Sequence, residues 1–107
     1  MIYKFKSKAG ADVIMLGPQG DQMLRLLGRE PSAQGIVTRD QLGTAIGALE
    51  AAVADDEVAF ARQQAEAEAA GETPPRREGI SLKQRAWPLV ELMRHSLKAG
   101  EDLVWGV

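Results

Sequence analysis

The sequence predicts an α+β fold in which an N-terminal β-hairpin and a C-terminal strand form a small sheet packed on about three helices, in the order β-β-α-α-α-β. Three observations predict it. Residues 2–7 and 12–16 are short runs rich in β-branched and aromatic residues, separated by a loop with a glycine. Two later segments with apolar residues at helical spacing each begin at a capping box. The chain then ends in LVWGV, a short β-rich run after a turn.

Length and composition indicate one domain. With 107 residues, 45% hydrophobic and 26% charged, the chain can form one conventional core and is too short for two ordinary domains. We expect residues 1–107 to form a single domain with a mobile linker at about residues 70–80, where GETPPRREG crowds prolines, glycines and charges. Because the chain has no cysteine, disulfides, thiolate zinc sites and cysteine nucleophiles are excluded.

In the predicted hairpin, strand alternation places Tyr3 and Phe5 on one face and Lys4 and Lys6 on the other. The aromatic side chains should face the core. Asp12 interrupts the apolar part of the N-terminal segment, which argues against an export signal. No window approaches the roughly 18 apolar residues that would span a bilayer. We therefore expect a cytoplasmic protein with no membrane association.

The stretch GPQGDQMLRLLG follows the apolar run VIML, an arrangement that raises the question of a phosphate-binding loop. The stretch lacks the lysine of a P-loop, and Pro18 removes a backbone donor. The carboxylate of Asp21, at the expected helix start, would repel a phosphate. We interpret residues 17–20 as a turn and Asp21 as the N-cap of a short helix that ends at Leu27, before a left-handed Gly28.

A second, longer helix is predicted to begin at the capping box formed by Thr38 and Gln41, and to continue to about Ala70. Residues 36–37 are interpreted as the entry to this helix. Its buried stripe has helical spacing and comprises Leu42, Ile46, Leu49, Val53 and Phe60.

A third helix should begin at a second capping box, Ser81 with Gln84, and Pro88 inside it should produce a kink or a local restart. Its core face gathers Leu82, Ala86, Leu89, Val90, Met93 and Leu97. The terminal run at residues 103–107 is predicted to be a strand that closes the sheet beside the hairpin and leaves an exposed edge.

The sequence offers few side chains that could form a catalytic, cofactor-binding or metal-binding site. His95 with Glu91 could form a metal clip or an acid–base pair, but both fall on a polar helix face with no further ligands at suitable spacing. Residues 55–57 are acidic, but consecutive helical residues point in different directions. We therefore predict no catalytic, cofactor-binding or metal-binding residues. Gly43 and Gly47, four residues apart, are expected to serve internal packing.

The candidate interaction residues are two tryptophans and a basic cluster. Trp87 and Trp105 are expected to be core residues, and either would be an interface anchor if exposed. Weak contact with an anion or nucleic acid would use the basic cluster beside the linker, which comprises Arg76, Arg77, Lys83 and Arg85.

Several segments together resemble a family of small bacterial proteins grouped as domain of unknown function 1840. These segments are MIYKFKSKAGADVIML, GIVTRDQLGTAIGALEAAV, SLKQRAWPLVELMRHSL and the terminal VWGV. The resemblance covers nearly the whole chain and is loosest around residues 66–78. It implies a standalone bacterial cytoplasmic protein, and it carries over no catalytic or binding residue.

These observations favour a non-enzymatic cytoplasmic binding or protein-interaction module whose partner is an unidentified protein or a second copy of the chain. One alternative is a small-ligand-binding protein or enzyme with a pocket between sheet and helices. Another is weak binding of nucleic acid or another anion through the basic cluster near residues 76–85. The net charge of −2 gives no overall attraction to nucleic acid, which disfavours it as the partner.

Overall fold

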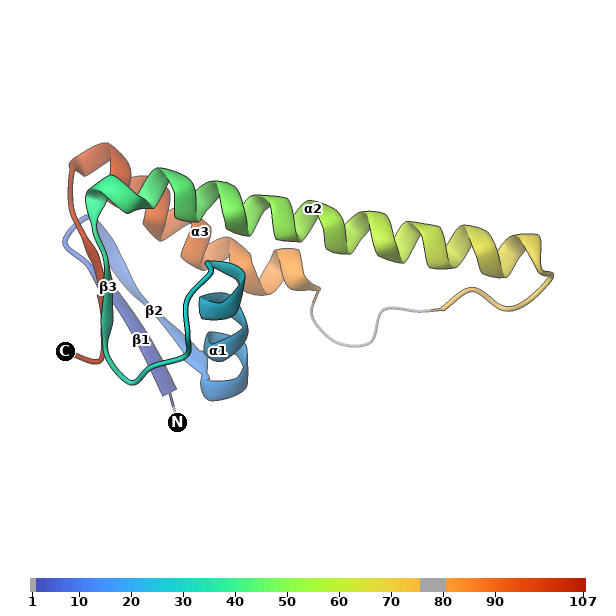
Figure 1. The fold of residues 1–107 in the computed structure, drawn as a ribbon, viewed down its shortest axis with the longest axis horizontal. Coiled ribbons are helices and arrows are strands. Elements are labelled where there is room, and N and C mark those ends of the chain that lie inside the picture. Colours follow the sequence, from blue (N-terminus) through green and yellow to red (C-terminus); the bar gives the residue numbers. More distant parts are fainter. Residues whose placement is uncertain (1, 76–80) are drawn as a thin grey trace.

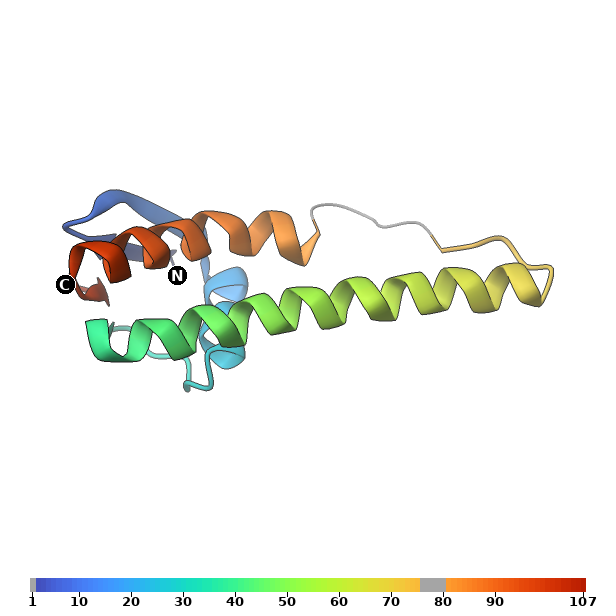
Figure 2. The same cartoon turned by 90° about the horizontal axis from the view of Figure 1, so that it is seen from above.

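A computed structural model describes residues 2–75 and 81–107 and confirms the α+β fold class (Figure 1). Its strands and helices, in chain order, are β1 (Ile2–Ser7), β2 (Gly10–Leu16), α1 (Gly17–Leu26), β3 (Gly35–Val37), α2 (Arg39–Ala69), α3 (Leu82–Ala99) and β4 (Leu103–Trp105). The four strands form one antiparallel sheet in the order β2-β1-β4-β3. The molecule is elongated, with extents of 51 × 28 × 23 Å, because α2 projects beyond everything else (Figures 1 and 2).

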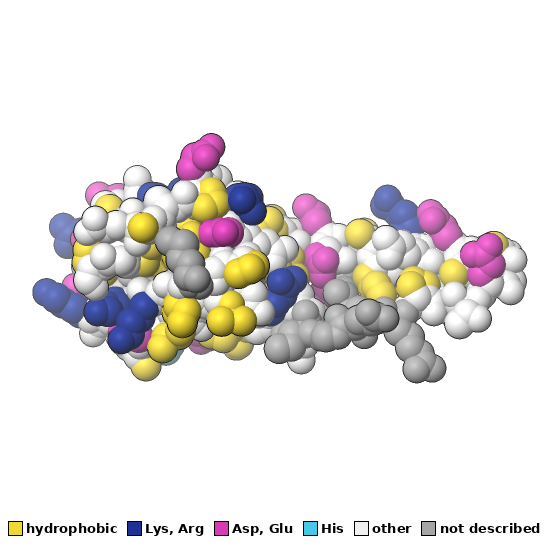
Figure 3. Space-filling view, turned by 90° about the horizontal axis from the view of Figure 1, so that it is seen from below, with side chains coloured by type: hydrophobic (Ala, Val, Ile, Leu, Met, Phe, Trp, Pro, Cys, Tyr) yellow, Lys and Arg dark blue, Asp and Glu magenta, His cyan; other side chains and the backbone are white. Residues whose placement is uncertain are grey.

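Helices α2 and α3 run side by side in opposite chain directions and, with α1, cover one face of the sheet (Figures 1 and 2). The opposite face of the hairpin is exposed and carries Ile2, Ile14 and Leu16, each more than 60% accessible. Seen from below, large hydrophobic side chains gather on the body of the molecule, and the projecting end of α2 shows acidic side chains interspersed with hydrophobic ones (Figure 3).

The core lies between the sheet and the helices, and the expected alternation in β1 is confirmed. Tyr3 and Phe5 are buried on the inner face, with ring centroids 5.9 Å apart, and Phe5 lies 5.7 Å from the ring of Trp105. Tyr3 and Phe5 are thus neighbours along β1, and Phe5 pairs with Trp105 on β4, an arrangement of rings that is favourable beyond area burial alone. From the helices, the completely buried apolar side chains are Met23, Leu24, Leu42, Leu49, Ala86, Leu89 and Met93.

Both predicted capping boxes are present, at Thr38 with Gln41 and at Ser81 with Gln84. These boxes satisfy amide groups that have no partner within the helix, which is why α2 and α3 begin where the sequence predicts. Helix α3 continues through Pro88 without a break, so the expected local restart is wrong.

The predicted start of α1 is wrong. The helix begins at Gly17, with Pro18 in its first turn, where the fixed φ of proline suits a helix and its missing N–H has no partner to lose. Asp21 therefore lies inside the helix and caps nothing; its carboxylate accepts a hydrogen bond from the Tyr3 hydroxyl. A Cβ at Gly20 would collide with the Tyr3 ring, so this glycine allows α1 to approach β1 closely.

Two strand assignments also need correction. Residues 36–37 belong to the short strand β3 and do not enter α2, because the backbone from Gly35 to Val37 pairs with β4. As a result β4 is an interior strand, between β1 and β3, and the exposed edge predicted for it is absent. The edges of the sheet are β2 and β3.

The linker predicted at residues 70–80 falls partly outside the described residues. Helix α2 ends at Ala69, and Gly71 adopts a left-handed conformation with φ of 73°. Residues 72–75 have no regular secondary structure.

Candidate interaction surface

The two tryptophans have opposite environments. Trp105 is 1% exposed in the middle of the sheet, where its Nε1 donates a hydrogen bond to the carbonyl of Ser32 at 3.1 Å. It therefore matches the expected core residue and offers no anchor for a partner. Trp87, on α3, is 48% exposed, so the expectation that it is a core residue is wrong. Its exposure meets the condition for an interface anchor.

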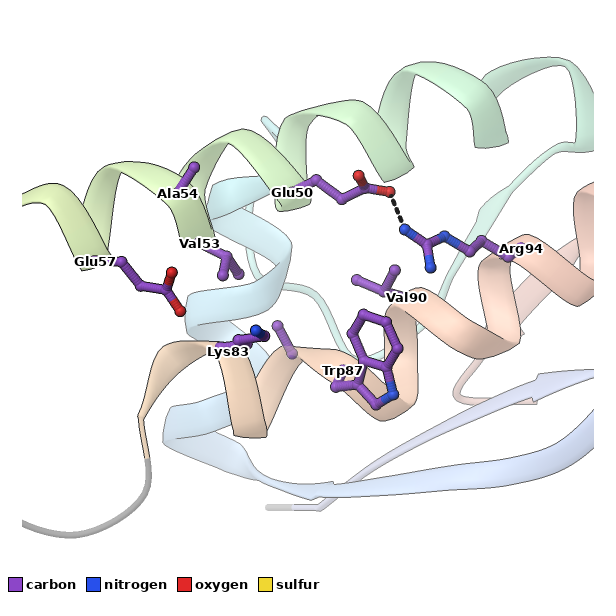
Figure 4. A pocket seen from close by; sticks show the side chains of 9 residues that line it. Glu50, Val53, Ala54, Glu57, Lys83, Trp87, Val90 and Arg94 are labelled. Atoms are coloured by element: carbon purple, nitrogen blue, oxygen red, sulfur yellow. Dashed lines mark hydrogen bonds and ion pairs between the residues drawn. The ribbon is translucent and has the colours of Figure 1, made fainter.

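Trp87 forms one wall of an open pocket of about 210 Å³ between α2 and α3 (Figure 4). Helices pack through side chains on their facing stripes, and at this position α2 contributes Val53 and Ala54 while α3 contributes Ala86 and Val90. These four side chains are smaller than the indole, so the Trp87 ring extends beyond them at the surface. The pocket therefore has an apolar base and an aromatic wall.

Arg94 holds the tryptophan in position. Its guanidinium lies 5.3 Å from the centre of the Trp87 ring, within the range of a cation–π contact. The same group donates to Glu50 of α2 at 2.7 Å (Figure 4). It also donates to Glu91 of α3 at 3.3 Å. The hydrogen bond to Glu50 raises the pKa of Arg94 above its usual value. The ring is thus stacked on a cation that is itself fixed between two helices.

The rim of the pocket carries both signs of charge. Glu57 of α2 and Lys83 of α3 line the end of the pocket away from Arg94, on opposite walls (Figure 4). Both side chains are exposed, and neither takes part in an ion pair in the part of the chain that the structure describes. Counting the paired Glu50 and Arg94, the rim is neutral overall.

The size of the pocket bears on what it can hold. Sites for drug-sized molecules usually occupy about 300–1,000 Å³, and the pocket between α2 and α3 is smaller, at about 210 Å³. Such a space suits one or two side chains of a partner protein better than a whole metabolite. Among the described residues, no group of three or more metal-ligating side chains occurs.

Other candidates from the sequence are not brought together here. His95 lies 3.8 Å from Glu91 on an exposed helix face, as expected for a surface pair. In the basic cluster, Arg76 and Arg77 lie outside the described residues. Arg85 turns inward and donates to Gln22 at 2.7 Å, so it does not extend into solvent beside Lys83.

Family comparison agrees with the resemblance seen in the sequence. The profile of a family described as Domain of unknown function (DUF1840) matches residues 1–105. The chain belongs to this family. No curated protein and no solved structure gives a significant match. In this DUF1840 protein, no helix of the described residues is long and apolar enough to cross a bilayer.

The contribution of Arg94 was missed from the sequence, although a signal was present. Trp87 and Arg94 are seven residues apart, which is two helical turns, so they share one face of α3. Glu50 could not have been identified in this way, because its position beside Arg94 depends on how α2 packs against α3.

Proposed function

We propose that this DUF1840 protein is a non-enzymatic cytoplasmic protein-interaction module, and that the pocket beside Trp87 is its contact surface. The observation that carries the proposal is the half-exposed tryptophan held by Arg94. Tryptophan and arginine are among the residues enriched at binding hot spots, and a ring fixed before binding loses little conformational freedom when a partner covers it.

The chemistry of the pocket favours a protein partner over the two alternatives. A nucleic acid requires a surface with excess positive charge, whereas the rim carries two acidic and two basic side chains, Glu50, Glu57, Lys83 and Arg94. A catalytic pocket holds its nucleophile or proton-transferring group in place, whereas here Glu50 is paired with Arg94, and Glu57 and Lys83 are exposed and form no ion pair among the described residues.

Site-specific photocrosslinking in cells tests the proposal. A photoreactive phenylalanine analogue replaces Ala54, which is exposed and lines the pocket. The matched control places the same analogue at Ala11, an exposed alanine on β2. We expect a discrete crosslinked product from position 54, lost when Trp87→Ala is added, and none from position 11. A product that persists without Trp87, or no product at position 54, contradicts the proposal.

A further inference from the structure

We propose that the partner at the Trp87 pocket is a second copy of the chain, and that two copies pack their α2–α3 layers together about a two-fold axis. This inference rests on the proposed function and names the occupant of that same site. In the resulting four-helix arrangement, α2 runs antiparallel to α2 of the second copy, with the α3 helices beside them on one side.

Charge complementarity supports a second copy. Glu57 and Lys83 are exposed on opposite walls of the pocket and take no part in an ion pair among the described residues. A two-fold axis near them brings Lys83 of each copy to Glu57 of the other, so both charges find partners at once. A two-fold interface is self-complementary when each charged group faces its opposite in the second copy, and the pairing of Lys83 with Glu57 meets this condition.

The outer face of α2 supports an antiparallel arrangement. It carries an exposed run of small side chains at Gly43, Gly47, Ala51, Ala54, Val58, Ala61, Ala65 and Ala69. The successive steps of 4, 4, 3, 4, 3, 4 and 4 residues keep the run on one helix face. The steps are the same when read backwards, so an antiparallel copy places each member opposite another member of the run.

The run and the charged rim share one centre. The middle of the run falls between Ala54 and Val58, beside Glu57, and Ala54 belongs both to the run and to the pocket. A Cβ built at Gly43 or Gly47 would meet nothing within 4 Å, so this face is open and the expectation that these glycines serve internal packing is wrong. One two-fold axis therefore satisfies both features.

The surface that α2 alone offers is too small for a stable dimer interface, so the interface has to include Trp87 of α3. A run of this length extends about 39 Å along a helix that is about 10 Å wide, so α2 alone offers roughly 400 Å² per copy. Stable interfaces bury about 800 Å² per partner. The remainder has to come from α3, where Trp87 provides the largest exposed apolar side chain.

A charge-reversal experiment in sedimentation velocity tests the inference. The full chain is measured over a concentration series as wild type, as Lys83→Glu, as Glu57→Lys and as an equimolar mixture of the two variants. We expect the wild type to dimerise. Each variant alone should have a dimer dissociation constant about tenfold higher or more, because like charges meet across the axis. The mixture should form a heterodimer with affinity near that of the wild type.

The controls separate folding from association. Lys8→Glu changes the same charge at an exposed site in the hairpin turn, and it should leave the dimer unchanged. Circular dichroism checks that each variant is folded. The series is repeated at higher salt, since acidic residues along α2 repel one another and salt screens this repulsion.

The outcomes distinguish this inference from the proposed function. A wild type that stays monomeric up to millimolar concentration overturns the second-copy inference, and so does a dimer insensitive to both charge reversals. A mixture that stays as dissociated as its components also overturns it. In each of these cases, a Trp87-dependent crosslink to a different protein would leave the proposed function standing.

Discussion

The regions around Trp105 and Trp87 use the same side chain in opposite ways. At Trp105, three strands and an aromatic neighbour enclose the indole, which is 1% exposed and makes a hydrogen bond through Nε1. At Trp87, two helices provide only a base and one wall, and the ring is 48% exposed. The first arrangement stabilises the fold, whereas the second holds an apolar surface in place where a partner can reach it.

An arginine lies over each tryptophan ring, but the two contacts differ in what they do. Arg29 lies over the Trp105 ring at 5.8 Å and covers a side chain that the sheet already buries. Arg94 lies over Trp87 at 5.3 Å and is anchored by Glu50, so it fixes the ring but leaves one side open. A cation–π contact can therefore complete a core or prepare a surface, depending on what else surrounds the ring.

The largest expected effect separates the two tryptophans by stability. Trp105→Ala should lower the free energy of unfolding by about 3–5 kcal/mol, because it removes a large buried side chain and leaves a cavity. Trp87→Ala should lower it by less than about 1 kcal/mol, as is usual at exposed positions. Urea denaturation followed by circular dichroism at low protein concentration measures both. Similar losses for the two variants would mean that Trp87 belongs to the core.

Tyr3→Phe tests the core beside Trp105 and should cost about 1.5–3 kcal/mol, the usual contribution of a hydrogen bond to a charged group. The hydrogen bond from the Tyr3 hydroxyl to Asp21 is the main cause that raises the pKa of Tyr3, and burial of the side chain is the second cause. This hydrogen bond contributes fully to the free energy of unfolding below about pH 10, which is the pKa of tyrosine in the unfolded chain. The contribution is lost as the pH rises through the higher pKa that Tyr3 has in the folded protein.

Tyr3 is the only tyrosine of the chain, so its ultraviolet titration reports this group alone. We expect a midpoint above that of a free tyrosine in the folded protein, and the free value in urea. A folded midpoint at or below the free value would contradict the hydrogen bond to Asp21.

Two glycine-to-alanine changes should have opposite signs. A Cβ at Gly35 would collide with the Trp105 ring, so Gly35→Ala should lower the free energy of unfolding by about 1–3 kcal/mol. At Gly47, in the interior of α2, a Cβ has open space, and Gly47→Ala should raise the free energy of unfolding by about 0.5–1 kcal/mol. Thermal melts of the monomer test the pair. If Gly47→Ala is destabilising, that helix face is not open.

The smallest expected effect concerns how firmly Trp87 is held. In a Trp105→Phe background, Trp87 is the only tryptophan, and Arg94→Gln should lower its fluorescence anisotropy because the cation above the ring and its link to Glu50 are lost. Arg62→Gln, on the projecting part of α2, serves as the control and should change nothing. Equal anisotropy in both variants would show that Arg94 does not fix the ring.

Local signals in the sequence predicted a large part of the fold. The alternation of Tyr3 and Phe5 and the capping boxes at Thr38 and Ser81 depend on neighbouring residues, and all appear as expected. Strand β3 was missed because three residues carry too little periodicity to reveal a strand that exists by pairing with β4. Asp21 was assigned to the N-cap for a different reason: Pro18 suits the first turn of a helix, so α1 begins at Gly17, and this signal was local. Only the hydrogen bond from the distant Tyr3 required the tertiary structure.

By itself, the sequence determined the α+β class, the starts of the two longer helices α2 and α3, and membership of the DUF1840 family, because short-range propensity, capping and segment similarity depend on neighbouring residues along the chain. Only the tertiary structure decided which tryptophan is buried. The two indoles have comparable apolar character, and exposure depends on whether a third element covers the ring. Strand β3 completes that cover at Trp105, whereas among the described residues nothing closes the open side of the pocket at Trp87.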